Sequence, residues 1–125
     1  MSNKMFLMIH SGIYALFAFV LFFLPEVLLP YYGVEIRDQY AYFLSQHNSI
    51  FLGGIAVMGM MLSGIEERSA MARQLFKGLM WTNLLGLIIT LYAGIKGIFV
   101  GFGWSDPAFF ALLALLNFWK VKANS

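Results

Sequence analysis

The sequence predicts an all-α fold: an integral membrane bundle of four transmembrane helices. Of its 125 residues, 61% are hydrophobic and only 11% are charged, whereas a soluble domain carries about 25% charged residues. Apolar segments recur along the chain, each close to the roughly 20 residues that a membrane-spanning helix needs. Lys and Arg gather at alternate ends of these segments, which is the charge pattern of a multi-span membrane protein.

The first helix is expected at residues 5–24, where Pro25 prevents its continuation. Its apolar run is too long for the core of a signal peptide, and no A-x-A-like cleavage site follows it, so we interpret it as a retained span. The second helix is expected at residues 45–65, ending at the charged residues 66–68.

The third helix is expected at residues 78–100, with a cytoplasmic extension that begins near Ser69. The fourth is expected at residues 107–122, with Ser105 or Asp106 as its cap and Pro107 at its first position. This last helix covers only about 24 Å, which is short for a bilayer. Residues 1–125 are therefore interpreted as a single transmembrane domain.

The basic residues predict the orientation. Arg37 and Lys96 lie on one side, and the other side collects Lys4, Arg68, Arg73, Lys77, Lys120 and Lys122. The positive-inside rule then places both chain ends in the cytoplasm, N-in and C-in. The expected location is a bacterial cytoplasmic (inner) membrane.

Small and polar side chains predict how the helices pack. The third helix carries a stripe of Asn83, Gly86, Thr90, Gly94, Gly97 and Gly101, and the second one of Ser49, Gly53, Ala56, Ser63 and Gly64. Because small residues let membrane helices approach closely, we expect these two stripes to face each other. Asn83 and Asn117 are each expected to bond to another helix, since an unpaired amide in lipid is costly.

The two histidines are candidate ligand contacts. His10 lies one turn before Tyr14 on the first helix, a pair that could relay a proton or contact a bound group. His47 lies near the opposite side of the membrane, so the two histidines are not expected to share a metal within one bundle. We favour a structural role for His10 at the interface, and haem ligation together with a partner chain is the alternative.

The outer side gathers the other candidates for a polar site, Glu26, Asn48, Lys96 and Asp106. Lys96 follows Lys77 by 19 residues, about 28 Å of helix and close to the hydrocarbon thickness. We therefore expect Lys96 to anchor the helix at the interface rather than to lie buried; a role as the partner of a carboxylate or a ligand anion stays open.

Several functions are excluded or disfavoured. The chain has no cysteine, which excludes disulfides and thiolate chemistry. It also lacks H-E-x-x-H, G-x-S-x-G and phosphate-loop motifs, so we expect no catalytic residues, no metal and no cofactor. The small net charge of +2 reports orientation and predicts no nucleic-acid partner.

The layout resembles the small bacterial four-helix membrane proteins near the DoxX-like families. The matching stretches are "LPEVLLPYYGVE", "NSIFLGGIAVMGMM" and "GFGWSDPAFFALL". The resemblance implies the four-span topology and no defined chemistry. The expected function is that of an accessory subunit, which packs in the lipid bilayer against other membrane-protein subunits or forms a homo-oligomer. The alternative is a binder or converter of a small lipophilic molecule such as a quinone, lipid, sterol or pigment.

Overall fold

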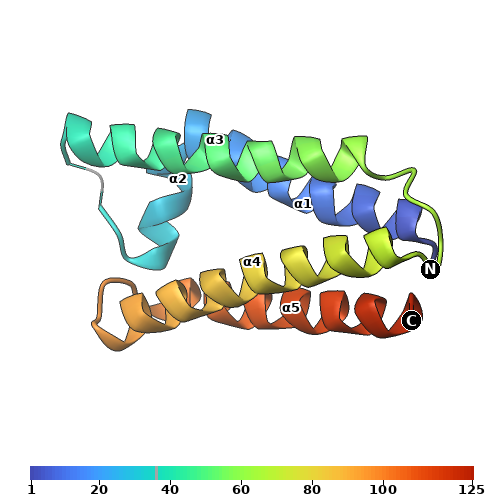
Figure 1. Ribbon diagram of the computed structural model, residues 1–125. Helices are drawn as coiled ribbons and strands as arrows, with labels where there is room; N and C mark the ends of the chain where they lie inside the picture. The colour runs from blue at the N-terminus through green and yellow to red at the C-terminus, as the bar shows by residue number, and fades with distance from the viewer. Residues whose placement is uncertain (36) are drawn as a thin grey trace. The chain divides into compact units, whose positions relative to one another are not determined.

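The computed structural model describes residues 1–35 and 37–125, which form helices and turns and contain no strand (Figure 1). The predicted all-α class is confirmed. The chain divides into two compact units, Met1–Gly64 and Ile65–Ser125. Each unit is a pair of long antiparallel helices, and we name the units the first and the second hairpin. The single transmembrane domain stays a prediction.

The first hairpin packs α1 (Asn3–Phe23) against α3 (Gln39–Met61). Ser2 caps α1 by accepting a hydrogen bond from the Met5 N–H at 3.1 Å. The connection contains α2 (Pro25–Leu28) and the 3₁₀ helix η1 (Leu29–Tyr32), after which Gly33 adopts a left-handed φ of 77°. Pro25 begins α2, so the predicted break after the first helix is confirmed.

The second hairpin packs α4 (Ala70–Ile95) against α5 (Ser105–Ala123), with the 3₁₀ helix η2 (Gly101–Trp104) before α5. At the end of α4, the Gly97 N–H bonds to the Gly94 carbonyl at 3.1 Å and the Ile98 N–H bonds to the Ala93 carbonyl at 2.9 Å. With Gly97 at φ 75°, these two bonds form a Schellman motif, which ends the helix.

The structure corrects several helix boundaries. The second long helix begins at Gln39 instead of about residue 45, because Asp38 caps it through the Ala41 N–H at 2.8 Å. It also ends early, at Met61 instead of about residue 65. The third ends at Ile95 instead of about residue 100, where the Schellman motif stops it. Its start near Ser69 is confirmed, since the Ser69 hydroxyl accepts from the Ala72 N–H at 3.0 Å.

The expected cap of the last helix is wrong. α5 begins at Ser105, with Trp104 at the capping position and no side-chain hydrogen bond there. The 3₁₀ turn of η2 runs directly into the helix, so the Ser105 N–H already has the Phe102 carbonyl as its acceptor. Pro107 therefore lies inside the first turn instead of at its first position.

Each small-residue stripe receives side chains from its own hairpin, and the predicted seam between the two stripes stays a prediction. In the first hairpin the stripe receives α1: a Cβ built on Gly53 would lie 3.7 Å from the Ala18 Cβ, and one on Gly59 would overlap the Ser11 hydroxyl. In the second hairpin a Cβ on Gly86 would lie 2.6 Å from the Phe110 ring. Each stripe thus accepts side chains from within its own hairpin, and Gly97 lies beyond the end of α4.

Asn83 and Asn117 each bond to a carbonyl of their own helix. The Asn83 side chain donates to the Leu79 carbonyl at 2.9 Å, and Asn117 donates to the Leu113 carbonyl at 2.8 Å. Both side chains are fully buried, and the Asn117 Oδ1 has no hydrogen-bond partner in the structure. For Asn117, the expected bond to another helix is therefore not found.

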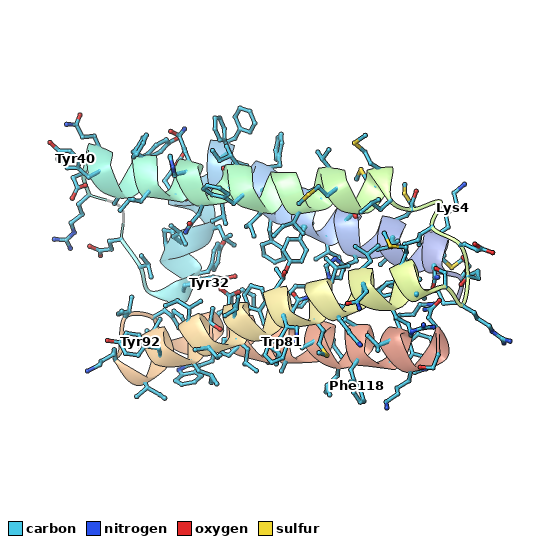
Figure 2. All side chains as sticks on the ribbon, in the orientation of Figure 1. Lys4, Tyr32, Tyr40, Trp81, Tyr92 and Phe118 are labelled. Atoms are coloured by element: carbon cyan, nitrogen blue, oxygen red, sulfur yellow. The ribbon has the colours of Figure 1, made fainter. Side chains whose placement is uncertain are left out.

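Large apolar side chains cover much of the exposed surface, as the sticks in Figure 2 show. By length and composition, two of the described helices, α1 and α4, are able to cross a membrane. The chain is therefore a helical protein with two candidate transmembrane helices.

Candidate functional site

The His10–Tyr14 pair forms a stack on α1. The two rings lie 4.9 Å apart between centroids at an interplanar angle of 17°, and Phe6 continues the stack 6.1 Å from His10. The spacing of four residues places all three on one face of the helix. His10 and Tyr14 are only 3% and 4% exposed. The predicted pair is thus brought together, inside a closely packed stack.

His47 has the opposite environment. It lies exposed on α3 between two phenylalanine rings, 5.1 Å from Phe43 and 5.8 Å from Phe51. Its flanking rings come from the preceding and the following turn of the same helix. His47 is therefore part of an aromatic surface and not of a pocket within the hairpin.

The register of the first hairpin separates the two histidines. The Ser45 hydroxyl bonds to the Leu21 carbonyl at 2.9 Å, while Gly59 lies opposite Ser11. His47 is therefore level with the last turns of α1, about ten residues or 15 Å along the helix from His10. Consistently, the part of the chain that the structure describes contains no cluster of three His, Cys, Asp or Glu residues that could hold a metal ion.

The polar run Ser45–Ser49 on α3 caps the C-terminal end of α1. Pro25 has no N–H, so the Leu21 carbonyl loses the donor that a continuing helix would supply. Ser45 replaces that donor at 2.9 Å, and the Gln46 side chain donates to the Phe22 carbonyl at 3.3 Å. These side chains satisfy the orphan carbonyls of a helix C-terminus. The run is thus structural at two of its positions.

The charged residues between α1 and α3 also have local roles or are open to solvent. Arg37 forms an ion pair with Glu35 on the surface, and Asp38 caps α3. Glu26 lies exposed in the first turn of α2, and Asn48 lies exposed on α3. Glu26 and Asn48 are therefore not enclosed in a site.

The polar residues at the turn of the second hairpin mark helix ends. Lys96 is exposed at the C-cap of α4, with its Nζ 5.8 Å from the centroid of the Tyr92 ring. A cation at this position interacts favourably with the negative end of the helix dipole. Asp106 is half-buried in the first turn of α5, where a carboxylate is favourable for the same reason. The expectation that Lys96 is not buried agrees with its exposure.

A cluster around Asn124 was not predicted. This side chain, 1% exposed, accepts from the Arg68 N–H and donates to the Lys120 carbonyl, at 2.9 and 2.8 Å. Its own carbonyl accepts from the Arg73 guanidinium at 2.9 Å. These bonds join the start of α4 to the end of α5. The sequence signal was an asparagine just past the last helix, where such residues commonly cap.

Comparison with protein-family models, curated proteins and solved structures found no match. The resemblance to DoxX-like families therefore stays a prediction, and the geometry of the two hairpins provides the basis for a functional proposal.

Proposed function

We propose that this chain is a small, non-catalytic integral membrane protein that packs as an accessory subunit against a larger membrane complex. One observation carries the proposal. The polar side chains of the predicted sites mostly close helix ends or stack within their own helices, while the exposed faces of the long helices consist of large apolar side chains. Such a surface suits lipid and apolar helices better than water.

The distribution of charged residues along the second hairpin supports a four-span topology with both chain ends in the cytoplasm. In the second hairpin the end that holds Asn124 collects Arg68, Arg73, Lys77, Lys120 and Lys122. The turn end of that hairpin has Lys96 and Asp106. This asymmetry follows the positive-inside rule, and we propose a bacterial inner membrane as the location.

The exposed face of α4 is the proposed contact with the larger complex. It consists of Trp81, Leu85, Ile88, Tyr92 and Ile95, which are between 55% and 76% exposed; Figure 2 labels Trp81 and Tyr92. Their spacing alternates between four and three residues, which lines them along one side of the helix. A neighbouring apolar helix can cover such a stripe along its whole length.

The binding of a small lipophilic molecule has less support. His10 and Tyr14, its best polar contacts, are buried in a stack with Phe6, and His47 is level with a different part of α1. A ligand would have to open this stack to reach the imidazole.

A site-specific crosslink tests the accessory role. A photoreactive benzoyl-phenylalanine at Leu85 should yield adducts with one defined larger membrane protein in native membranes, identified by mass spectrometry. The same probe at Leu113, a buried α5 residue, is the matched control and should give no such adduct. Adducts with lipid alone at Leu85, or a chain that salt or carbonate washes from the membrane, would contradict the proposal.

A further inference from the structure

An exposed stripe runs the full length of α3. The large apolar side chains along this stripe are at least 54% exposed. His47 is exposed as well, and Gly54 lies in the middle of the stripe. We name this stripe the α3 face; it comprises Tyr40, Phe43, Leu44, His47, Ile50, Phe51, Gly54, Val57, Met58 and Met61. Positions 40, 47, 54 and 61 are one heptad apart, with the other members three or four residues after them. This heptad spacing is typical of the residues that form the seam between two helices packed side by side.

The α3 face is opposite to the surface that α1 covers. Ser45, Gly53 and Gly59 contact α1, and none of them belongs to the α3 face. On the α3 face itself the rings of Phe43, His47 and Phe51 follow one another up the helix at 5.1 and 5.8 Å. One side of α3 therefore packs against α1, and the opposite side is exposed.

Gly54 makes a notch in the middle of the α3 face. A Cβ added there would meet no atom of the first hairpin within 4 Å, so packing inside that hairpin does not require the glycine. Bulky residues lie one turn away on either side, at Ile50, Phe51 and Met58. A glycine between large side chains allows the backbone of another helix to come close while those side chains surround the contact.

The absence of charged residues from α3 points to a second copy of the same helix as the partner of the α3 face. When two identical helices pair in parallel, each interface residue lies near its own copy, so a charged residue in the interface would face a like charge. Residues 39–61, which form α3, include no Asp, Glu, Lys or Arg. The other three long helices each include charges: Lys4 in α1, Arg73 and Lys77 in α4, and Asp106, Lys120 and Lys122 in α5. Among these four, α3 is the one with no charged residue on any face, so a parallel pair of α3 helices brings no like charges together whichever face it uses.

The size of the face is sufficient. Its aromatic members, such as Tyr40 at 71% and Phe51 at 63% exposed, each present on the order of 100 Å². The whole face therefore offers on the order of the 800 Å² that a standard protein interface buries on each partner.

We infer that α3 pairs in parallel with α3 of a second copy of this chain, with Gly54 at the closest approach and His47 facing His47. The inference rests on the proposed membrane embedding, because two copies inserted in the same way present α3 in the same direction. Two neutral imidazoles can bond to each other, since each has one donor and one acceptor nitrogen.

Disulfide scanning tests the pairing directly, because the chain has no cysteine. A symmetric disulfide requires that the same residue from two copies approach within about 7 Å between Cα atoms. In oxidised native membranes, Gly54→Cys should form a dimer at least tenfold faster than Leu16→Cys, a position on α1 that is 62% exposed and belongs to neither proposed interface. Equal rates at the two positions, or a disulfide-free Gly54→Cys in the membrane fraction, would overturn the inference.

A size change at the notch gives an independent readout. Gly54→Leu should weaken dimerisation of the purified chain in phosphatidylcholine liposomes at least tenfold, measured by energy transfer between labelled copies. Gly12→Leu is the matched control, because a Cβ there also meets nothing within 4 Å, and it should leave the dimer unchanged. A monomeric wild type in liposomes would refute the pairing while leaving the accessory role intact, whereas a chain that does not enter liposomes would refute the accessory role.

Discussion

At the scale of single residues, Asn124 does more than its position near the chain end suggests. Its side chain bonds to both the start of α4 and the last turn of α5, through the Arg68 N–H and the Lys120 carbonyl. Arg68 has a positive φ of 56°, which is uncommon for a residue with a side chain. The bond to Asn124 offsets part of the cost of that conformation.

We expect Asn124→Ala to lower the free energy of unfolding by about 1–2 kcal/mol, because the Arg68 N–H loses its acceptor and the Lys120 carbonyl loses one of its two donors. Unfolding in mixed detergent micelles, followed by tryptophan fluorescence, measures the change. Asn48→Ala is the control, since Asn48 is exposed, and it should be neutral. Equal effects of the two substitutions would show that the Asn124 bonds contribute nothing.

Gly97 is a second residue whose identity the backbone requires. Its φ of 75° is accessible to glycine at little cost. We expect Gly97→Ala to destabilise the chain by about 1 kcal/mol. Gly78→Ala, in the interior of α4 where a Cβ meets nothing within 4 Å, should instead stabilise it by up to about 1 kcal/mol. Thermal unfolding of both variants measures the difference, and a Gly97→Ala protein that melts no lower than the wild type would contradict the Schellman assignment.

At the scale of elements, α1 depends on α3 for its end. Pro25 leaves the Leu21 carbonyl without a helical donor, and Ser45 donates to it from the neighbouring helix. The hydrogen bond therefore satisfies a partly buried acceptor and also fixes the register of α1 against α3.

Ser45→Ala should destabilise the first hairpin by about 0.5–1.5 kcal/mol, the net value of one hydrogen bond. Ser125→Ala is the control, because the Ser125 hydroxyl bonds only within its own helix end and should matter little. Hydrogen exchange of the last turn of α1 provides the local measurement. Faster exchange at Leu24 is expected in Ser45→Ala alone; unchanged exchange would mean that Ser45 does not hold this turn.

The sequence predicted which segments are helices better than where they end. Pro25 and Ser69 were recognisable in the sequence as helix-boundary residues, and both mark helix boundaries in the structure. The Asp38 cap was missed because α3 begins with mixed residues, before the apolar stretch that predicted the helix. The Schellman motif at Gly97 was missed because apolar residues continue the hydrophobic pattern past the true boundary. In a chain this apolar, hydrophobicity does not distinguish a helix from the turn that follows it.

At the scale of the whole molecule, the sequence indicated the residue pairs within a helix but not those between helices. His10 and Tyr14 are neighbours because four residues make one turn, so their stack was predictable. Which side chains enter the glycine positions, such as Phe110 at Gly86, was not predictable, because a glycine stripe does not specify the side chains it receives. The bonds of Asn124 and Ser45 depend on the register of two helices, which no local pattern encodes.

The proposed topology predicts which positions an impermeant maleimide reaches in intact cells. Single cysteines at Tyr31 and Val100, exposed positions in the two hairpin connections, should be labelled from outside. Ser2→Cys and Ser125→Cys, at the two chain ends, should be labelled only after the cells are opened. Labelling of Ser125→Cys in intact cells would contradict the N-in and C-in arrangement.

The division into two hairpins has a consequence for biosynthesis. Residues 1–64 contain both caps of their own long helices and the side chains that fill their glycine notches. We therefore expect the ribosome to release the first hairpin into the bilayer as a finished pair while the second is still being translated. A nascent chain stalled once residue 64 has left the ribosome should already resist protease, because no residue of the second hairpin is needed to close the first.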